Sequence, residues 1–289
     1  MAILRLRSLG DCVLTTPALD ILKHARPDLR LAIVVEPRFA EIFAGNPHVD
    51  EILPPALGAL RRFRPRLCLN LHGGARSAWM TAFSGARWRA GLGHFRHQFL
   101  YNVHIPRAQE ILGVERKVHT AEHLASAMFY LGAPPMEIPR ARLQCGAGCH
   151  PARRLATGAF AVIHAVAAAP AKTWRADGFL QLAEALQQSA IEPIFIGAAT
   201  DDLSPFANYR ILQGAPLSEI KALLSAAALF VGNDSGPAHM AAAFGIPVVA
   251  IFLDSDPLIW APWRTPSAVL VSPQPEQVLE AVARLRVHA

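Results

Sequence analysis

Asp11 is the first residue of this 289-residue chain whose type and position could do chemistry. It follows a strand expected at 2–7 and precedes a helix expected at 12–25, so its carboxylate would lie at a helix N-terminus, where the dipole favours the ionised form. Such a carboxylate can act as a general base toward a sugar hydroxyl. Simple capping of the helix by Asp11 is the alternative, and the residues alone favour it.

The stretch 229–252 holds a second group of candidates. The apolar runs at its two ends predict buried parallel strands. Pro237 and Gly245 occupy the positions typical of the start and the end of a helix between those strands. The turn 234–236 would then present a carboxylate and backbone N–H groups at a helix N-terminus, where a phosphate or diphosphate binds. Helix capping by Asp234 is an equally good interpretation.

Three further polar residues lie close to predicted strand ends or helix starts. Lys172 follows a strand expected at 161–164 and could neutralise a diphosphate, although a solvated lysine is the commoner outcome. Asp201 follows a strand expected at 193–196 and could accept hydrogen bonds from a ribose or a base, or be solvated. His239, in the first turn of the helix after 234–236, could reach a phosphate or be an ordinary, partly buried histidine.

Strands and helices alternate along the chain, which is typical of doubly wound α/β domains. The remaining elements are expected as strands at 31–35, 49–53 and 67–71, and as helices at 39–43, 76–84, 119–131, 179–189, 217–226 and 275–287. Pro17 would kink the first helix or mark its start near Thr16. Residues 132–159 are rich in Pro, Gly, Ala and Arg, and they predict a linker between domains 1–150 and 151–289. The final helix, 275–289, could pack back on the first domain.

The basic residues are unevenly distributed. Residues 1–150 carry a net charge of +8 and residues 151–289 a net charge of −2. This asymmetry points to an anionic partner for the first half: a phosphorylated glycolipid, a membrane surface or a nucleic acid. Basic and aromatic residues also interleave in the less regular stretch 87–107, as on a nucleic-acid or sugar-phosphate surface. No nucleic-acid-binding motif accompanies them, so we do not expect a nucleic-acid partner.

Composition also bears on compartment and metal binding. There is no apolar run near the roughly 20 residues of a membrane span, and Met1–Arg5 has no signal-peptide layout, so we expect a cytoplasmic protein. Disulfides are therefore not expected among the four cysteines, Cys12, Cys68, Cys145 and Cys149. Cys145, Cys149 and His150 have a spacing like that of metal ligands, but no second ligand pair follows, so we expect no metal site.

Taken together, the motifs resemble those of a known family. Residues 233–247, with Asn233-Asp234-Ser235-Gly236-Pro237 and His239, resemble the C-terminal signature of the bacterial lipopolysaccharide heptosyltransferases, glycosyltransferase family 9. Residues 5–19, with Ser8, Gly10 and Asp11, resemble the N-terminal motif. The segments 70–77, 84–91 and 172–174 follow in the family's order. The resemblance covers nearly the whole chain.

The resemblance implies a GT-B architecture: two Rossmann-like, doubly wound parallel-sheet domains facing across a cleft, the first binding the acceptor and the second the nucleotide sugar. It implies inverting, metal-independent transfer of a heptose from ADP-heptose to a lipopolysaccharide core, with no cofactor and with Asp11 as the general base. The implied nucleotide-sugar residues are Lys172, Asp201, Asp234, Ser235, Gly236 and His239, and the implied acceptor residues are Ser8, Gly10, His72, Arg76, His119 and Glu122.

The resemblance has consequences for partners and one departure. An anionic core acceptor suits the basic first half, and the cluster Arg61–Arg66 could hold the protein at the inner face of the inner membrane. The family commonly has hydroxyl-bearing or glycine residues in the loop after the strand at 161–164, whereas this chain has Val166-Ala167-Ala168-Ala169-Pro170. This departure suggests a non-catalytic nucleotide- or glycolipid-binding homologue as an alternative. A sugar-nucleotide epimerase of the same architecture is a further alternative.

Overall fold

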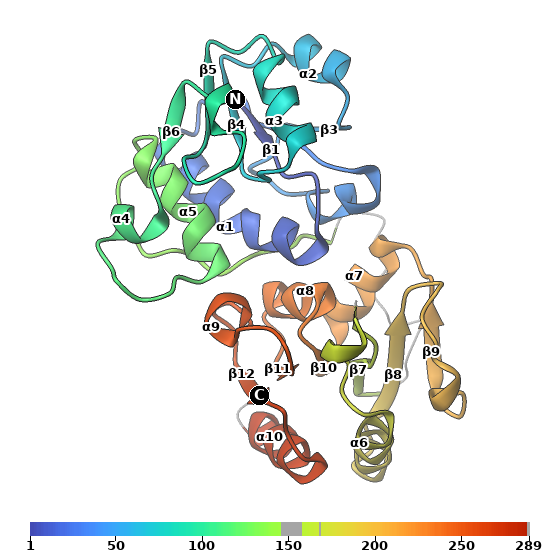
Figure 1. The fold of residues 1–289 in the computed structure, drawn as a ribbon. Coiled ribbons are helices and arrows are strands. Elements are labelled where there is room, and N and C mark those ends of the chain that lie inside the picture. Colours follow the sequence, from blue (N-terminus) through green and yellow to red (C-terminus); the bar gives the residue numbers. More distant parts are fainter. Residues whose placement is uncertain (146–157, 168, 288–289) are drawn as a thin grey trace. The chain divides into compact units, whose positions relative to one another are not determined.

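The computed structural model of the chain describes residues 1–145, 158–167 and 169–287. The chain separates into two compact units, Met1–Gln144 (unit 1) and Cys145–Ala289 (unit 2). The domain boundary predicted after residue 150 and residues 146–157 of the predicted linker lie outside the described residues. Each unit is a parallel sheet with helices, so the predicted α/β class and the two Rossmann-like sheets are confirmed (Figure 1).

Unit 1 contains a six-stranded parallel sheet in the order β3-β2-β1-β4-β5-β6. Its strands are β1 (Ala2–Leu4), β2 (Ala32–Val34), β3 (Glu51–Leu53), β4 (Leu67–Asn70), β5 (Trp88–Leu92) and β6 (Val103–Ile105). Its α-helices are α1 (Leu9–Ala25), α2 (Leu57–Phe63), α3 (Ala75–Ala82), α4 (Ala108–Leu112) and α5 (Thr120–Tyr130), and η1 (Pro37–Ile42) and η2 (Gln98–Leu100) are 3-10 helices.

Unit 2 repeats this strand order with its own six strands, as β12-β11-β10-β7-β8-β9. The strands are β7 (Phe160–His164), β8 (Glu192–Gly197), β9 (Arg210–Gln213), β10 (Leu229–Asn233), β11 (Val248–Phe252) and β12 (Ser267–Val271). The α-helices are α6 (Ala176–Gln188), α7 (Leu217–Ala226), α8 (Gly236–Phe244), α9 (Pro257–Trp260) and α10 (Pro275–Val287), and η4 (Pro170–Lys172) and η5 (Ser204–Phe206) are 3-10 helices.

The cores explain why the central strands are almost purely apolar. Every residue of β1, β10 and β11 is buried, as expected for parallel strands covered on both faces. In unit 1, Leu60 and Phe63 of α2 and Met80 of α3 pack on one face of the sheet, while α1 packs against α5. In unit 2, α6 and α10 pack on one sheet face, with Val278 and Ala281 of α10 fully buried there. The last helix thus contributes to the core of its own unit.

Helix α1 continues through Pro17 instead of beginning after it. A proline at this position cannot donate to the carbonyl of Val13, four residues earlier. The hydroxyl of Thr16 donates to that carbonyl instead, at 2.8 Å. The helix therefore begins at Leu9, earlier than predicted, with Ser8 as its N-cap residue, and Asp11 lies in its first turn.

Four strands were not predicted. The stretch 87–107, expected to be less regular, contains β5 and β6, and β9 and β12 were also missed. Strand β5 has no β-branched residue, and its Gly91 is required because a Cβ there would lie 2.2 Å from the Tyr101 ring. Only the fold shows this packing. The predicted helix at 39–43 is the 3-10 helix η1.

Both sheets share one topological feature that bears on function. The first strand of each unit lies between the second and the fourth, so successive connections leave β1 and β4, or β7 and β10, in opposite directions. Ligands bind beyond the carboxyl ends of strands at such a switch point. We call these places switch point 1 (after β1 and β4) and switch point 2 (after β7 and β10).

Candidate functional site

Switch point 1 brings Asp11 together with a buried arginine. Nη1 of Arg5, the residue after β1, lies 3.4 Å from Oδ1 of Asp11, and the Ser8 hydroxyl donates to Asp11 Oδ2 at 3.0 Å. Arg5 is only 6% exposed, so this contact is shielded from water. Since Ser8 is the N-cap residue, the interpretation of Asp11 as the cap is wrong. Gly10 is buried in the same first turn, beside the carboxylate.

Two histidines, His72 and His123, lie near this carboxylate, and a third, His94, contacts His123. His72, after β4, has its pKa lowered by burial and then by the charges of Arg5 and Arg7. His123 of α5 has its pKa lowered to about 4, mainly by burial and then by His94 and Arg5, while Asp11 opposes the shift. The rings of His94 and His123 lie 5.5 Å apart. These histidines are therefore neutral at pH 7 and can exchange hydrogen bonds with sugar hydroxyls.

Asn70 fixes the loop that carries His72. Its Oδ1 accepts from the backbone N–H groups of His72 and Gly73, at 2.9 and 3.2 Å, and its Nδ2 donates to the Tyr101 hydroxyl at 2.7 Å. Gly73 has φ +79°, and a Cβ there would lie 2.7 Å from the Phe95 ring. Asn70 thus connects β4 to the segment after β5.

Three of the predicted acceptor residues have contacts within the fold instead. Arg76 is exposed on α3, and its guanidinium donates to the Pro55 carbonyl at 2.9 Å. His119 and Glu122 form the capping box of α5, and Glu122 also pairs with Arg116 at 2.6 Å. These contacts account for the three side chains, and none of them places a side chain beside Asp11. Their assignment to the acceptor stays a prediction.

Arg5, His94 and His123 were missed as site residues. Arg5 belongs to the N-terminal motif and could have been found from its position directly after a buried strand. His94 follows β5, a strand that was not predicted, so its position at a strand end was not visible in the sequence. His123 is brought to the site by the packing of α5 on α1, for which a sequence gives no local signal.

Switch point 2 presents the N-terminus of α8. Pro237 lies in its first turn, and Gly245 ends the helix with φ +80°, as predicted. Ser235 is the N-cap residue, so the interpretation of Asp234 as the cap is wrong. The Ser235 hydroxyl interacts with Nδ1 of His164 at 3.0 Å. Pro237 has no backbone N–H and Ala238 donates its N–H to the Ser235 carbonyl at 3.1 Å, so the N–H groups that the turn can offer a ligand are those of Ser235 and Gly236.

Asp234 lies in a different environment from Asp11. Burial raises its pKa, while the neighbouring Ser255 hydroxyl and the charge of Lys172 act in the opposite direction. Nε2 of His239 is 3.9 Å from Asp234 Oδ1, and His239 is 3% exposed. Switch point 2 therefore gathers Lys172, Asp234 and His239 with Ser235 and Gly236, as predicted. A diphosphate bound there would meet backbone N–H groups and one ammonium group.

The loop between β7 and α6 is held by Asn233. Its Nδ2 donates to the Ala165 carbonyl at 2.9 Å, and its Oδ1 accepts from the Trp174 N–H at 2.8 Å. Trp174 is buried against Phe179 of α6, and its Nε1 donates to the Pro273 carbonyl at 3.0 Å. Trp174 thus packs α6 against the sheet, and its backbone N–H fixes the end of the loop that carries Lys172.

Asp201 closes the turn after β8. Its Oδ2 accepts from the Ala198 N–H at 2.7 Å. Burial lowers the pKa of His164, at the neighbouring strand end, to about 4, and the charge of Asp201 opposes this shift. Asp201 thus lies next to switch point 2 and retains a second carboxylate oxygen for a ligand.

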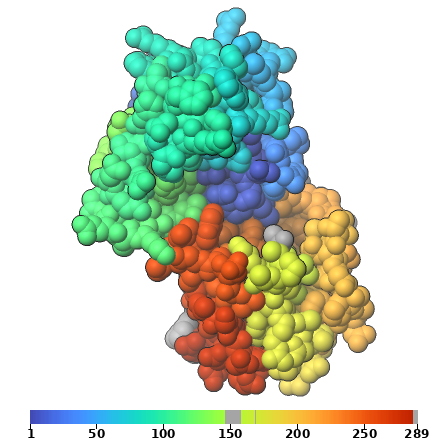
Figure 2. Space-filling model, viewed as in Figure 1, coloured from blue at the N-terminus to red at the C-terminus, as the bar shows by residue number. Residues whose placement is uncertain are grey.

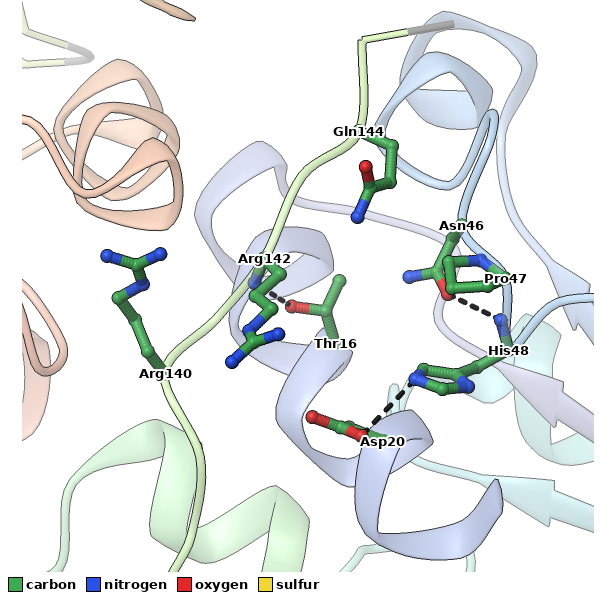
Figure 3. Close-up of a pocket in the computed structure, with 8 residues that line it drawn as sticks. All are labelled: Thr16, Asp20, Asn46, Pro47, His48, Arg140, Arg142 and Gln144. Carbon is green, nitrogen blue, oxygen red and sulfur yellow. Dashed lines mark hydrogen bonds and ion pairs between the residues drawn. The ribbon is translucent and has the colours of Figure 1, made fainter. Parts of the chain in front are cut away.

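A separate hollow of about 80 Å³ lies in unit 1 (Figure 3). In it His48 Nε2 pairs with Asp20 Oδ1 at 3.2 Å, and the Arg142 N–H donates to the Thr16 hydroxyl at 3.1 Å. Arg140 also lines it, but its guanidinium points away from Asp20. None of the predicted site residues lines this hollow, so the candidate chemistry lies at the two switch points.

The described residues contain no group of three or more His, Cys, Asp or Glu side chains placed to hold a metal ion. Cys149 and His150, which have a spacing like that of metal ligands, lie outside these residues. Within the described part of the chain, no helix is both long and apolar enough to span a bilayer.

Each unit thus has a Rossmann-like sheet, with a carboxylate at switch point 1 and, at switch point 2, a helix N-terminus of the kind that can bind an anion. The family model for glycosyltransferase family 9 (heptosyltransferase) matches residues 59–284. The chain therefore belongs to this family and is a glycosyltransferase.

Individual relatives agree with this assignment. Lipopolysaccharide heptosyltransferase 3 of Escherichia coli K12 is 25% identical over 88% of this chain and 82% of its own length. The crystal structure of a family 9 glycosyltransferase from Veillonella parvula matches with a TM-score of 0.86 and 19% identity, over 100% of this chain and 97% of that one. The structure of the Escherichia coli heptosyltransferase WaaC with ADP matches with a TM-score of 0.81 and 19% identity, over 98% of this chain and 99% of that one. The fold is that of the GT-B heptosyltransferase structures.

Proposed function

We propose that the protein transfers a heptose from ADP-heptose to a lipopolysaccharide core acceptor, with inversion at the anomeric carbon and without a metal or other cofactor. The names of the relatives support the acceptor class, and the ADP complex of a structural relative supports the nucleotide. The observation that carries the proposal is the contrast between the switch points: a carboxylate held by Arg5 in unit 1, and a helix N-terminus with Lys172 in unit 2.

The acceptor side of the reaction is proposed for switch point 1. Asp11 takes the proton of the acceptor hydroxyl as its oxygen bonds to the anomeric carbon. Arg5 contacts one carboxylate oxygen and Ser8 the other, so the carboxylate has a fixed orientation and each oxygen keeps a free lone pair. A base in this role need not be strong, because the proton leaves while the new C–O bond forms. His72 lies next to Asp11 and is proposed to bind an acceptor hydroxyl.

The donor side is proposed for switch point 2. As the bond between the anomeric carbon and the diphosphate oxygen breaks, its electron pair moves to the leaving ADP. The backbone N–H groups at Ser235 and Gly236 and the ammonium of Lys172 stabilise this growing negative charge. We assign Asp234 and His239 to the sugar of the donor and Asp201 to its nucleoside. The loop at 166–170 has no side-chain hydroxyl, so backbone groups and Lys172 must supply the contacts of that loop.

The first test follows the reaction itself. We expect the protein to form a glycosylated product from ADP-heptose and a heptose-deficient core acceptor, seen by mass spectrometry. NMR of the product should show the anomeric configuration opposite to that of the donor, and EDTA should leave the rate unchanged. Retention of configuration, or loss of rate with EDTA, would contradict the proposed mechanism. Donor consumed without acceptor would favour an epimerase, and ADP binding without turnover would favour a non-catalytic homologue.

The second test isolates Asp11. Asp11→Asn should lower kcat by roughly 10²–10⁴, the range for loss of a general base. Asp20→Asn is a matched control, because Asp20 lies on the same helix but pairs with His48 away from the site. Equal losses in both variants would assign Asp11 a structural role only. We also propose a cytoplasmic site of action, which cell fractionation can test.

A further inference from the structure

Residues 52–109 contain nine arginines and no lysine, aspartate or glutamate. The segment therefore carries a formal charge of +9, more than the net charge of the whole chain. All of these arginines except Arg89 are exposed, and the segment holds no acidic residue that could neutralise them. An anionic surface is the natural partner for such a concentration of positive charge.

The same segment contains exposed aromatic side chains. Trp79, Phe83, Trp88 and Phe99 are 46%, 52%, 44% and 69% exposed, and no other tryptophan or phenylalanine in the described part of the chain is as open. Isolated apolar residues on a surface need no explanation, but four large rings within one short segment do. Figure 2 shows that the teal-to-green segment, which includes these residues, forms much of the visible surface of unit 1.

Arginines and aromatic rings are in direct contact. Trp79 and Phe83 stack along α3 with ring centroids 5.6 Å apart, and Arg61 Nε donates to the Phe83 carbonyl at 2.8 Å. The Arg87 guanidinium lies 5.0 Å from the centre of the Trp88 ring. We call these five residues the α3 patch. Helix α3 also contacts η2, which carries Phe99.

We propose that the α3 patch docks the protein on the surface of an anionic lipid bilayer. Arginine side chains near such a surface are attracted to the lipid headgroups, and tryptophan and phenylalanine rings insert at the boundary between headgroups and acyl chains. The choice of a lipid surface over a nucleic acid rests on the proposed function, whose acceptor is a lipid-anchored glycan. The contacts within the patch also favour a lipid surface over a nucleic acid. A neighbouring ring or guanidinium already covers one face of each of Trp79, Phe83 and Trp88, which leaves fewer ring faces on which a base could stack.

Co-sedimentation of the full chain with vesicles tests this without donor or acceptor. We expect binding to vesicles of phosphatidylcholine mixed with phosphatidylglycerol, weak binding to phosphatidylcholine alone, and release by added salt. The R61Q/R87Q variant should bind the anionic vesicles about tenfold or more weakly, in line with the contribution of each cation near a charged surface. The W79S/F83S variant should show a loss of similar size. Tyr130→Ser, at an equally exposed ring outside the segment, should bind like the parent chain.

Two readouts separate this proposal from the proposed function. Thermal unfolding should be unchanged in the patch variants, since these side chains are exposed, and turnover of a soluble, deacylated acceptor should be retained. Vesicle binding without turnover would support the docking proposal and contradict the proposed reaction. The docking proposal is overturned if the parent chain does not bind anionic vesicles or if the patch variants bind them as the parent chain does. Binding of an oligonucleotide at the patch, without binding of vesicles, would also overturn it.

Discussion

In unit 1, Arg5 follows β1 and Asn70 ends β4; in unit 2, His164 ends β7 and Asn233 ends β10. Both asparagines use the side-chain amide in the same way, each accepting from backbone N–H groups and donating through Nδ2. The groups that the two switch points offer to a ligand differ. Unit 1 offers a carboxylate held by an arginine, and unit 2 offers small residues, backbone N–H groups and Lys172.

The comparison shows how one fold can supply both halves of a transfer reaction. The strand order fixes where a ligand can bind, and a few residues after each strand decide which chemistry occurs there. A base needs a fixed carboxylate with a free lone pair, whereas a diphosphate needs donors and close approach of the backbone. If this division holds, changes at switch point 1 alter turnover and changes at switch point 2 alter nucleotide affinity.

Arg5→Met is expected to have the largest effect among the following changes. It removes the cation that orients Asp11, and a misplaced catalytic group costs on the order of 100-fold in rate. We expect kcat to fall by about that factor with little change in ADP affinity, and Arg5→Lys to recover part of the rate. Steady-state kinetics with titration of ADP measures both. If Arg5→Met changed only the affinity for ADP, the assignment of turnover to unit 1 and of nucleotide binding to unit 2 would be wrong.

Lys172→Met should give the converse result. A hydrogen bond between a charged group and its partner contributes about 1.5–3 kcal/mol, so ADP affinity should fall roughly 10- to 100-fold. Lys172→Arg keeps the charge and should retain most of the affinity. Isothermal titration calorimetry is the measurement, and an unchanged Kd for ADP would remove Lys172 from the site.

Asn70 and Asn233, which each hold a loop at one switch point, allow a matched pair of variants. Asn70→Ala removes the partner of the buried Tyr101 hydroxyl and of two part-buried backbone N–H groups, and Asn233→Ala removes the partner of two buried backbone groups. Each should cost about 1–3 kcal/mol of unfolding free energy. Asn46→Ala, which removes a single hydrogen bond to the His48 N–H, should cost less. Asn70→Ala should raise KM for the acceptor, and Asn233→Ala should weaken ADP binding. The same functional defect in both would contradict the division of roles.

Acid should destabilise the protein through one histidine at each switch point. His123 and His164 have a folded-state pKa of about 4, below the value near 6.5 of an unfolded chain. The unfolded state therefore binds more protons between pH 4 and 6.5, and stability is lost as pH falls through this range. Each histidine should contribute roughly 1–2 kcal/mol between pH 7 and 5. In urea unfolding, the free energy of unfolding of His123→Gln and of His164→Asn should depend less steeply on pH than that of the parent chain. An unchanged pH dependence in these variants would contradict this role of the two histidines.

The sequence was enough to predict two α/β sheets, because buried parallel strands have strong local patterns, and it placed Asp11, Lys172 and Asp234 after such strands. Ser8, Gly10 and His72 came only from the resemblance to the family. It was not enough for β5, whose Trp88-Arg89-Ala90-Gly91-Leu92 lacks β-branched residues. It was also not enough for the pair of His94 and His123, which only the packing of distant segments brings together. The predicted caps, Asp11 and Asp234, were wrong because a serine takes that position in both helices.

The central claim is that the base belongs to unit 1 and nucleotide binding to unit 2. Titration of ADP into the Asp11→Asn variant tests it most directly, alongside the same variant's turnover. The account predicts a Kd for ADP equal to that of the parent chain, together with the loss of turnover expected for a missing base. A weakened ADP affinity that accounts for the lost activity, or full turnover without the Asp11 carboxylate, would contradict it.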